Sequence, residues 1–449
     1  MRNIVIVGGG IAGLLSALMY AKSGAKVSLI ENSGEIGGLL RSYVSPDGYS
    51  FDFGTHFLRE TGLKELDELL FGELCRPTWQ SFNVLKNGNY FYGKLNEASP
   101  FVDARSLPEN VYKKGEEELL AIKEAPRDVS NLFEQLTLTY GETYFRKIYE
   151  PLLQKFFNTD ARQLAPNTHV LAGLSLLLIK TPHETRELKK DGFNNARIGF
   201  HSFNEGISTL QNFYPSSGGI GLWVNSLERR LRARGVNFYL NSQATAFVMK
   251  NGHVSGVVLN CGTKVPCDHL VWTVPSALFL QVAGIKSSRE RPDFVGSKVL
   301  HFLSDQPPQT PLYFIACHDP KMATYRVTFQ SNCQPGEVFE SYPVTVESIV
   351  SQDLHIQKTD CEVAEELLAM GLFSKQTEFN LVNSQQVKNG FPVPTIKARK
   401  LALDDLALAR KYAPNISFFG KGSGGAFFMN EVLVDTFKRI KNSLENNAA

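Results

Sequence analysis

The most regular hydrophobic pattern of the chain lies near its N-terminus. Residues 4–7 form a short apolar run, as in a parallel strand that is buried on both faces. From residue 11 to residue 23 the apolar positions recur at helical spacing, and Gly24 is expected to end this helix. Residues 26–30 predict a second strand. Together these segments predict a β-α-β unit with a parallel sheet.

The turn between the first strand and the helix has the spacing of a phosphate-binding loop. Gly8, Gly10 and Gly13 form a GxGxxG pattern, which allows a tight turn, a close approach to a pyrophosphate and close helix–strand packing. The unpaired amides and the dipole of the helix N-terminus favour a diphosphate there. Glu31 closes the second strand, where a carboxylate can bind the ribose hydroxyls of a dinucleotide. A tight turn without a ligand is the alternative, and it leaves Glu31 unexplained.

Patterns further along the chain are shorter. Residues 62–210 are expected to be largely helical, with a buried helix at 170–179 and a hairpin turn at residues 87–89. Further strands are expected at the segments 236–240, 244–249, 253–259, 270–275 and 416–420, and a final helix is expected at 431–444.

Length and composition narrow the classes of protein. With 449 residues the chain suits two domains, and 43% hydrophobic and 20% charged residues are ordinary for a globular protein. A net charge of +2 argues against a dedicated nucleic-acid surface or a polybasic membrane anchor. The longest apolar stretch is too short to span a membrane, and no secretory signal is visible. The six cysteines form no CxxC or metal-ligand spacing, so we expect reduced thiols, no metal and a cytoplasmic protein.

A second glycine pair indicates which dinucleotide is bound. Gly37 and Gly38, followed by Arg41 and Ser42, resemble the signature of the flavin-dependent amine oxidase superfamily, which includes UDP-galactopyranose mutases and protoporphyrinogen oxidases. The segment from Gly420 into the last helix resembles the second FAD fingerprint of this superfamily. The resemblance implies FAD as the cofactor. The residues expected to bind it are Gly8, Gly10, Ile11, Ala12, Gly13, Glu31, Asn32, Gly38, Leu39, Arg41, Gly54, Thr55, His56, Val248, Gly420, Phe428 and Met429.

The resemblance also implies an architecture. The expected fold class is α/β, with a Rossmann-like FAD-binding domain and a discontinuous α+β substrate-binding domain. The FAD-binding domain would comprise residues 1–57, 212–275 and 390–449, and the substrate-binding domain residues 58–211 and 276–389. The flavin ring should lie where the two domains meet.

His56 is the first of three candidate catalytic residues. The segment FDFGTHF at residues 51–57 resembles the Gly-x-His segment of galactopyranose mutases, which implies that Gly54 lets the backbone approach the flavin and that His56 lies at its face. The alternative is a structural histidine. The second histidine of the mutases is absent, because Leu58, Arg59 and Glu60 follow instead.

Arg326 is the second candidate. It lies in the sequence YRVTFQSN, which resembles a segment of eukaryotic mutases whose arginine holds the substrate diphosphate. A guanidinium suits this task, because it stays charged and binds phosphate bidentately. The alternative is a cross-strand pair between Arg326 and an acidic residue.

Lys298 is the third candidate. It opens a strand at residues 296–299, in a context where monoamine oxidases place a lysine that is bonded through water to the flavin. The alternative is a solvated strand end.

Three classes of function follow from these residues. The first is a mutase-like FAD-dependent enzyme with a polar small-molecule substrate, for which a nucleotide sugar is the candidate. The second is an amine or protoporphyrinogen-type oxidase or desaturase that passes electrons to oxygen or another acceptor. The third is a flavin-binding protein without catalysis. The mutase tryptophan after Lys155 and the mutase arginine after Gly420 are absent, since Phe157 and Lys421 stand there. No oligomeric state is predicted.

Overall fold

The predicted β-α-β unit lies at the centre of a five-stranded parallel sheet. In this computed structural model, which describes residues 1–75, 77–205, 208–286, 292–350 and 358–446, the strand order is β12-β2-β1-β16-β22. The bounds of these strands are Asn237–Tyr239 for β12, Lys26–Ile30 for β2, Asn3–Val7 for β1, His269–Trp272 for β16 and Ile416–Phe418 for β22. Every neighbouring pair is parallel. Segments from both ends and from the middle of the chain therefore share one sheet.

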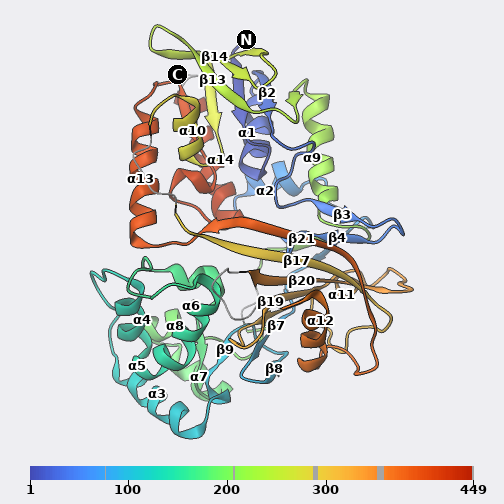
Figure 1. Ribbon diagram of the computed structural model, residues 1–449, viewed down its shortest axis with the longest axis vertical. Coiled ribbons are helices and arrows are strands. Elements are labelled where there is room, and N and C mark those ends of the chain that lie inside the picture. Colours follow the sequence, from blue (N-terminus) through green and yellow to red (C-terminus); the bar gives the residue numbers. More distant parts are fainter. Residues whose placement is uncertain (76, 206–207, 287–291, 351–357, 447–449) are drawn as a thin grey trace.

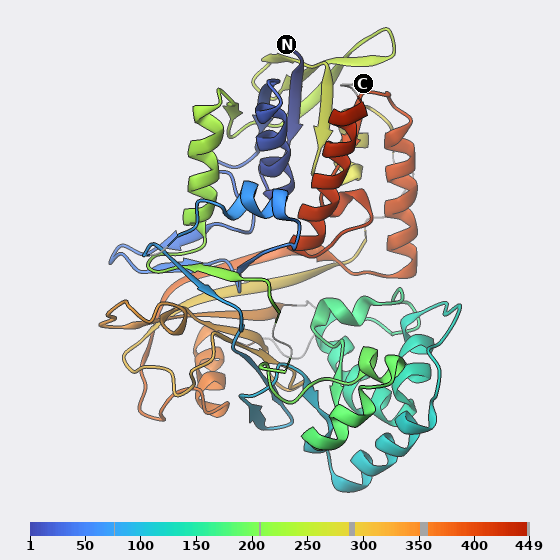
Figure 2. The same cartoon turned by 180° about the vertical axis from the view of Figure 1, so that it is seen from behind.

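Helices and a second sheet cover the two faces of this parallel sheet. On one face α1 (Ile11–Lys22) packs between α9 (Gly221–Ala233) and α14 (Met429–Asn446), and α2 (Lys64–Phe71) joins their apolar core. Figure 2 shows α9, α1 and α14 side by side in green, blue and red. The other face carries α10 (Ser276–Val282), α13 (Ile396–Arg410) and the sheet of β13 (Ala244–Lys250), β14 (His253–Leu259) and β15 (Lys264–Pro266).

A mixed seven-stranded sheet lies beneath the parallel-sheet domain (Figure 1). Its strands, in order, are β21 (Phe379–Pro392), β17 (Phe294–Ser304), β20 (Tyr342–Val350), β19 (Thr324–Phe329), β18 (Phe314–Cys317), β7 (Asn87–Phe91) and β8 (Lys94–Asn96). One face packs on α12 (Asp360–Ala369), through Leu300 and Phe302 of β17 and Val363 of the helix. The opposite face turns toward the parallel-sheet domain, where His301 packs on Phe51. Short α11 (Gln330–Cys333) follows β19.

A helical lobe, residues 104–197, lies beside the seven-stranded sheet (Figure 1). It is built from the elements η1 (Ala104–Ser106), α3 (Glu109–Ala121), α4 (Leu132–Tyr140), α5 (Glu142–Tyr144), the π-helix η2 (Phe145–Tyr149), α6 (Glu150–Phe157), η3 (Thr168–Ala172), α7 (Pro182–Leu188) and α8 (Gly192–Arg197). Strands β9 (Val102–Asp103) and β10 (Leu177–Leu178) pair at its base. Large apolar side chains such as Leu136, Phe145 and Leu152 form its own core.

Smaller elements connect these parts. The three-stranded sheet β5-β11-β6 consists of Leu58–Arg59, Asn212–Pro215 and Trp79–Phe82. The hairpin of β3 (Ser42–Val44) and β4 (Ser50–Asp52) projects from the parallel-sheet domain, and η4 (Lys421–Ser423) precedes α14. Within the described residues, no helix combines the length and the apolar character that crossing a bilayer requires.

Two local predictions are wrong. Residues 170–179 form the end of η3 and strand β10 rather than one buried helix, because Gly173 takes a left-handed conformation that ends the first turn. The hairpin turn between β7 and β8 lies at Tyr92 and Gly93, both with positive φ, and not at residues 87–89. Gly88 is instead in the strand, where a Cβ would lie 2.5 Å from Leu312 Cδ1. Residues 62–210 also include strands β6 to β10, so this region is less helical than expected.

Candidate functional site

The glycine loop at the carboxyl end of β1 has the geometry of a phosphate cradle. Gly8 has a φ of 105°, which favours glycine, and a Cβ on Gly13 would lie 1.9 Å from the Gly8 carbonyl oxygen. Gly10 differs, since among the described residues no atom beyond its two chain neighbours lies within 4 Å of the position of its missing Cβ. Two glycines thus fix the turn, and the third leaves open space in front of the first turn of α1. This space fits a pyrophosphate held by the helix N-terminus.

Glu31 is held beside the cradle at the end of β2. Its Oε2 accepts a hydrogen bond from the Gly9 amide at 2.7 Å, and its Oε1 accepts from the amide and hydroxyl of Ser33 at 2.9 and 2.8 Å. Asn32, the next predicted cofactor residue, accepts a hydrogen bond from the Gln243 side chain. The carboxylate is therefore fixed in orientation at the edge of the loop, where a ribose would lie.

The second glycine pair closes over the first glycine loop. A Cβ on Gly38 would lie 3.5 Å from Gly10 Cα, and the Gly37 amide donates to the Gly9 carbonyl at 2.8 Å. The Arg41 guanidinium donates from Nε to the Gly38 carbonyl at 2.8 Å and pairs with Glu35 at 3.0 Å. Through these contacts with Gly38 and Glu35, Arg41 makes the Gly37–Gly38 loop more rigid.

The predicted second fingerprint meets the cradle from the other end of the chain. A Cβ on Gly420 would lie 3.3 Å from Ala12 Cβ, so this glycine lies against the start of α1. At the start of α14, Glu431 accepts hydrogen bonds from the amides of Phe427 and Phe428 at 3.0 and 3.1 Å. Both fingerprints therefore converge on one place.

Apolar side chains are exposed at the predicted cofactor positions. Leu39 is 60% exposed and Phe428 44% exposed, and Val248 on β13 is also exposed, whereas Met429 packs against the core. Isolated exposed apolar residues are ordinary, but Leu39 directly follows Gly38, which lies against Gly10 of the cradle, and Phe428 directly precedes α14. A bound dinucleotide with an aromatic ring system would cover them, so the residues present fit FAD.

His56 lies in the loop between β4 and β5, which contacts Glu347 of the seven-stranded sheet through the Thr55 amide. Its Nε2 is 3.2 Å from the Phe53 carbonyl, to which it donates, so Nδ1 of the neutral ring is an acceptor. Burial in the domain junction lowers the pKa of His56 to about 4, and the positive charges of Arg326 and Lys421 add to this effect, whereas Glu347 opposes it. His56 is therefore uncharged at neutral pH.

Arg326 pairs with Glu347 of the neighbouring strand. Its Nε and Nη2 donate to the two carboxylate oxygens of Glu347 at 2.5 and 2.7 Å, and the two residues are register partners of β19 and β20. The cross-strand pair, the alternative reading of the sequence, is thus present. Burial disfavours the Glu347 anion, but Arg326 and the Tyr325 hydroxyl outweigh this effect, so the pKa of Glu347 lies below its ordinary value. Near His56 the two charges balance.

Lys298 is not brought to the other candidates. It forms an ion pair with Asp360 at the start of α12, on the face of β17 that turns away from the parallel-sheet domain. Because side chains alternate along a strand, His301 of β17 faces the domain junction, whereas Lys298 faces the opposite side of the sheet. The structure gives Lys298 the position of a structural ion pair and not that of a group facing a flavin.

Three functional candidates were missed in the sequence. Glu347 and Tyr325 surround Arg326, and Lys421 lies 4.3 Å from the centre of the Phe427 ring and close enough to His56 to lower its pKa. The signal for Glu347 is a single acidic residue inside the otherwise uncharged run 343–350, which is rich in Val, Ile and Thr. In the sequence, Lys421 stands out only as a replacement for arginine.

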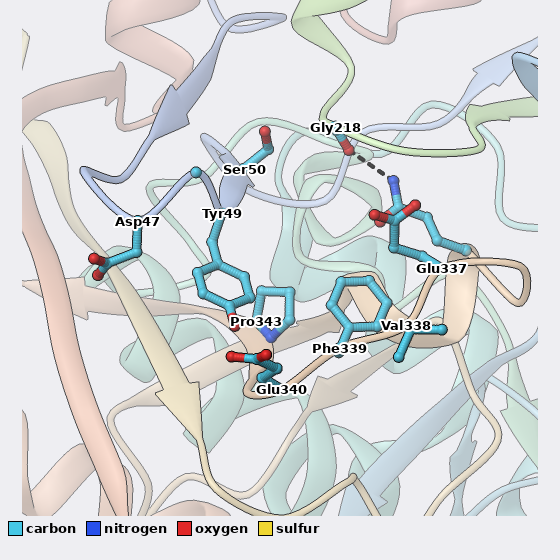
Figure 3. A pocket seen from close by; sticks show the side chains of 11 residues that line it. Asp47, Tyr49, Ser50, Gly218, Glu337, Val338, Phe339, Glu340 and Pro343 are labelled. Atoms are coloured by element: carbon cyan, nitrogen blue, oxygen red, sulfur yellow. Dashed lines mark hydrogen bonds between the residues drawn. The ribbon is translucent and has the colours of Figure 1, made fainter.

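A separate cavity of about 310 Å³ lies between the β3–β4 hairpin and the loop before β20 (Figure 3). It is lined by the acidic residues Asp47, Glu337 and Glu340 and by the rings of Tyr49 and Phe339. Gln334 closes one wall by donating to the Gly218 carbonyl at 2.7 Å. None of the predicted site residues lines this cavity.

Comparison with known proteins agrees with the cradle and the fold. Residues 6–70 match the family of NAD(P)-binding Rossmann-like domains. A 4,4'-diaponeurosporene oxygenase of Staphylococcus aureus is 25% identical over an alignment of 289 residues, which covers 60% of this chain and 55% of the relative. The chain thus matches about half the length of this curated relative.

Solved structures match nearly the whole chain. A reduced UDP-galactopyranose mutase has a TM-score of 0.71 at 17% identity, covering 97% of this chain and 90% of that protein. A putrescine oxidase variant has a TM-score of 0.61 at 13% identity, covering 99% of both chains. The predicted fold class is therefore confirmed, a Rossmann-like α/β domain with a second, α+β domain. The chain therefore shares the fold of this mutase and this oxidase over nearly its whole length.

Proposed function

We propose that this chain is an FAD-dependent oxidoreductase whose flavin is held between the glycine cradle and the His56 loop. The observation that carries the proposal is the open cradle, with free space at Gly10 and the exposed Leu39 directly after Gly38, which lies against Gly10. When bound, the flavin supplies the acceptor for two electrons. The match to NAD(P)-binding Rossmann-like domains and the fold of the chain support the same cofactor class.

The protein's own residues would bind and orient the reactants. Neutral His56 offers Nδ1 as a hydrogen-bond or proton acceptor at the domain junction. Lys421 supplies a positive charge on the same side, and burial lowers its pKa. The seven-stranded sheet and the helical lobe would exclude water from a substrate bound beneath the flavin.

The absorbance spectrum of the purified full-length protein tests this proposal. We expect flavin bands, and release of FAD on denaturation identified by mass. A protein that stays colourless after incubation with FAD would overturn the proposal. A yellow protein whose flavin is reduced by no candidate substrate would instead be a flavin-binding protein without catalysis.

A nucleotide sugar is one candidate substrate. The resemblance of residues 325–332 to the mutase segment, and the fold shared with the reduced UDP-galactopyranose mutase, favour it. The pairing of Arg326 with Glu347 counts against it, because a diphosphate would have to share this guanidinium with a carboxylate. Titration of oxidised and dithionite-reduced protein with UDP and UDP-sugars decides: tighter binding by the reduced form supports the mutase reaction, and no binding in either state excludes it.

Oxidation of an amine or of an uncharged hydrocarbon is the second candidate. The balanced charges of Arg326 and Glu347 favour it, as does the similarity to a diaponeurosporene oxygenase. The test is anaerobic mixing with amines and with polyene hydrocarbons while the flavin absorbance is followed. Bleaching by a compound of either class identifies the substrate class, and the absence of bleaching with all of them contradicts this candidate.

A further inference from the structure

Glu347 is a buried carboxylate at the junction of the two domains. Its side chain is 6% exposed, and it accepts hydrogen bonds from five groups. Besides the two donors of Arg326, these are the Thr55 amide at 3.0 Å, the Thr55 hydroxyl at 3.5 Å and the Tyr325 hydroxyl at 2.7 Å. With its one carboxylate, Glu347 therefore binds both Thr55, the residue before His56, and the guanidinium of Arg326.

Local backbone features bring these groups to Glu347. In β19, a β-bulge between Thr324 and Arg326 places two residues of this strand opposite one residue of β20. The neighbours Tyr325 and Arg326 can therefore both reach the same carboxylate. Gly54 has a φ of 104°, and a Cβ there would lie 2.7 Å from Glu347 Oε2. The loop before His56 can approach the carboxylate only because Gly54 lacks a side chain.

A second contact fixes the same loop. The hydroxyls of Thr55 and Thr328 lie 2.5 Å apart, which joins the loop to β19 as well as to β20. His56, the next residue, is faced by the charges of Glu347, Arg326 and Lys421. The backbone next to His56 is therefore held by a carboxylate of the seven-stranded sheet.

We propose that Glu347 is a positioning residue, which sets the His56 ring and the Arg326 guanidinium in one arrangement at the flavin face. This inference rests on the proposed function for the presence of the flavin, but not for the arrangement of the side chains. Glu347 itself touches no reacting atom. It acts through the Thr55 backbone and through its charge.

The test compares Glu347→Gln with a matched control in the full-length protein. Glu366→Gln is that control, because Glu366 is also a buried carboxylate that accepts from two amides of the Ala323–Thr324 segment at 2.9 Å and pairs with Lys358 at 2.8 Å. It lies on α12, on the far face of the sheet. Three quantities are measured: the thermal midpoint, the titration of the His56 ring by NMR, and the visible circular dichroism of bound FAD.

We expect both variants to lower the thermal midpoint, but only Glu347→Gln to alter the site. In that variant His56 titrates at lower pH than in wild type, because the anion that raises its pKa is gone, and the visible dichroism of the flavin changes. Wild-type titration and dichroism in Glu347→Gln, or equal changes in Glu366→Gln, would overturn the inference.

Two further measurements keep the inference testable. If Glu347→Gln does not fold, Tyr325→Phe removes one donor to Glu347 while keeping the ring, and an unchanged flavin dichroism in that variant would contradict the inference. If wild-type protein takes up no FAD, the proposed function fails. The His56 titration in the flavin-free protein still decides whether Glu347 acts on that ring.

Discussion

The ammonium group of Lys155 donates a hydrogen bond to the carbonyl oxygen of Thr324 at 2.8 Å, joining the helical lobe to the strand that carries Arg326. The same ammonium donates to the carbonyls of Cys317 and Asp319 at 3.0 and 2.9 Å. Burial lowers the pKa of Lys155, but its three donors all have acceptors. One buried side chain thus fixes the ends of β18 and β19.

Lys155→Met should destabilise the protein strongly. The substitution keeps an unbranched side chain but leaves three buried carbonyls without their donor, which costs about 2–5 kcal/mol in the free energy of unfolding. Urea denaturation measures this loss. Lys147→Met, at an exposed position of the preceding π-helix, is the control and should change the free energy of unfolding by less than about 0.5 kcal/mol. Equal stability of the two variants would contradict the role given to Lys155.

Gly10→Ala should weaken FAD binding without disturbing the fold. Gly10 has a φ of −75° and free space at its Cβ position, so the backbone accepts alanine, but the added methyl group occupies the pyrophosphate space. We expect FAD affinity to fall about tenfold or more, equivalent to about 1.4 kcal/mol. Flavin fluorescence titration measures the affinity, and the thermal midpoint of the flavin-free protein should stay as in wild type. Gly192→Ala, also in open space but in the helical lobe, should bind FAD normally.

His169→Phe should flatten the dependence of stability on pH. Burial lowers the pKa of His169 from 6.5 to about 4, so between these values the unfolded chain binds more protons than the folded chain. The contribution of neutral, buried His169 to the free energy of unfolding is therefore fully present above pH 6.5. It decreases by up to about 3 kcal/mol as the pH falls toward 4. Phenylalanine removes this titration. The free energy of unfolding in urea should differ less between pH 7 and pH 4.5 in the variant than in wild type. An unchanged difference would contradict the lowered pKa of His169.

Glu431→Gln should raise the reduction potential of bound flavin. The Glu431 carboxylate complements the positive end of α14 through the amides of Phe427 and Phe428, close to the cradle. Removing this anion makes added negative charge on a nearby flavin less costly. Equilibrium reduction with a reference dye measures the potential. Glu445→Gln, at the opposite end of the same helix, is the matched control, and a shift of the same size there would point to a non-local effect.

The N-terminal unit could be predicted nearly residue by residue. The strand expected at 4–7 is found as β1, the helix expected at 11–23 is α1, and the strand expected at 26–30 has those bounds in β2. The reason is that each element carries its own complete signal: an apolar run, a helical period and a glycine at each turn. The later strand expected at 253–259 was found for the same reason, since it follows a clear Asn-Gly turn.

The partner of Arg326 could not be predicted from local pattern. Glu347 lies on a different strand, and its contact depends on the register of β19 and β20 and on the bulge at Tyr325. Sequence reasoning could state that Arg326 binds either an external anion or an internal acid, because both satisfy a guanidinium equally well. It could not place Lys298, whose side of β17 follows from packing against α12. Which side chains share a face across strands is decided by tertiary pairing.

The shared parallel sheet has a consequence for synthesis of the protein. Strand β1 leaves the ribosome long before β22, which begins at Ile416 and completes its sheet, and before α14, which completes its helical layer. The glycine loop therefore emerges long before the strands and helices that hold it in place. Contacts this distant along the chain form slowly. The nascent chain must keep its apolar first strand from aggregating until the last helix arrives.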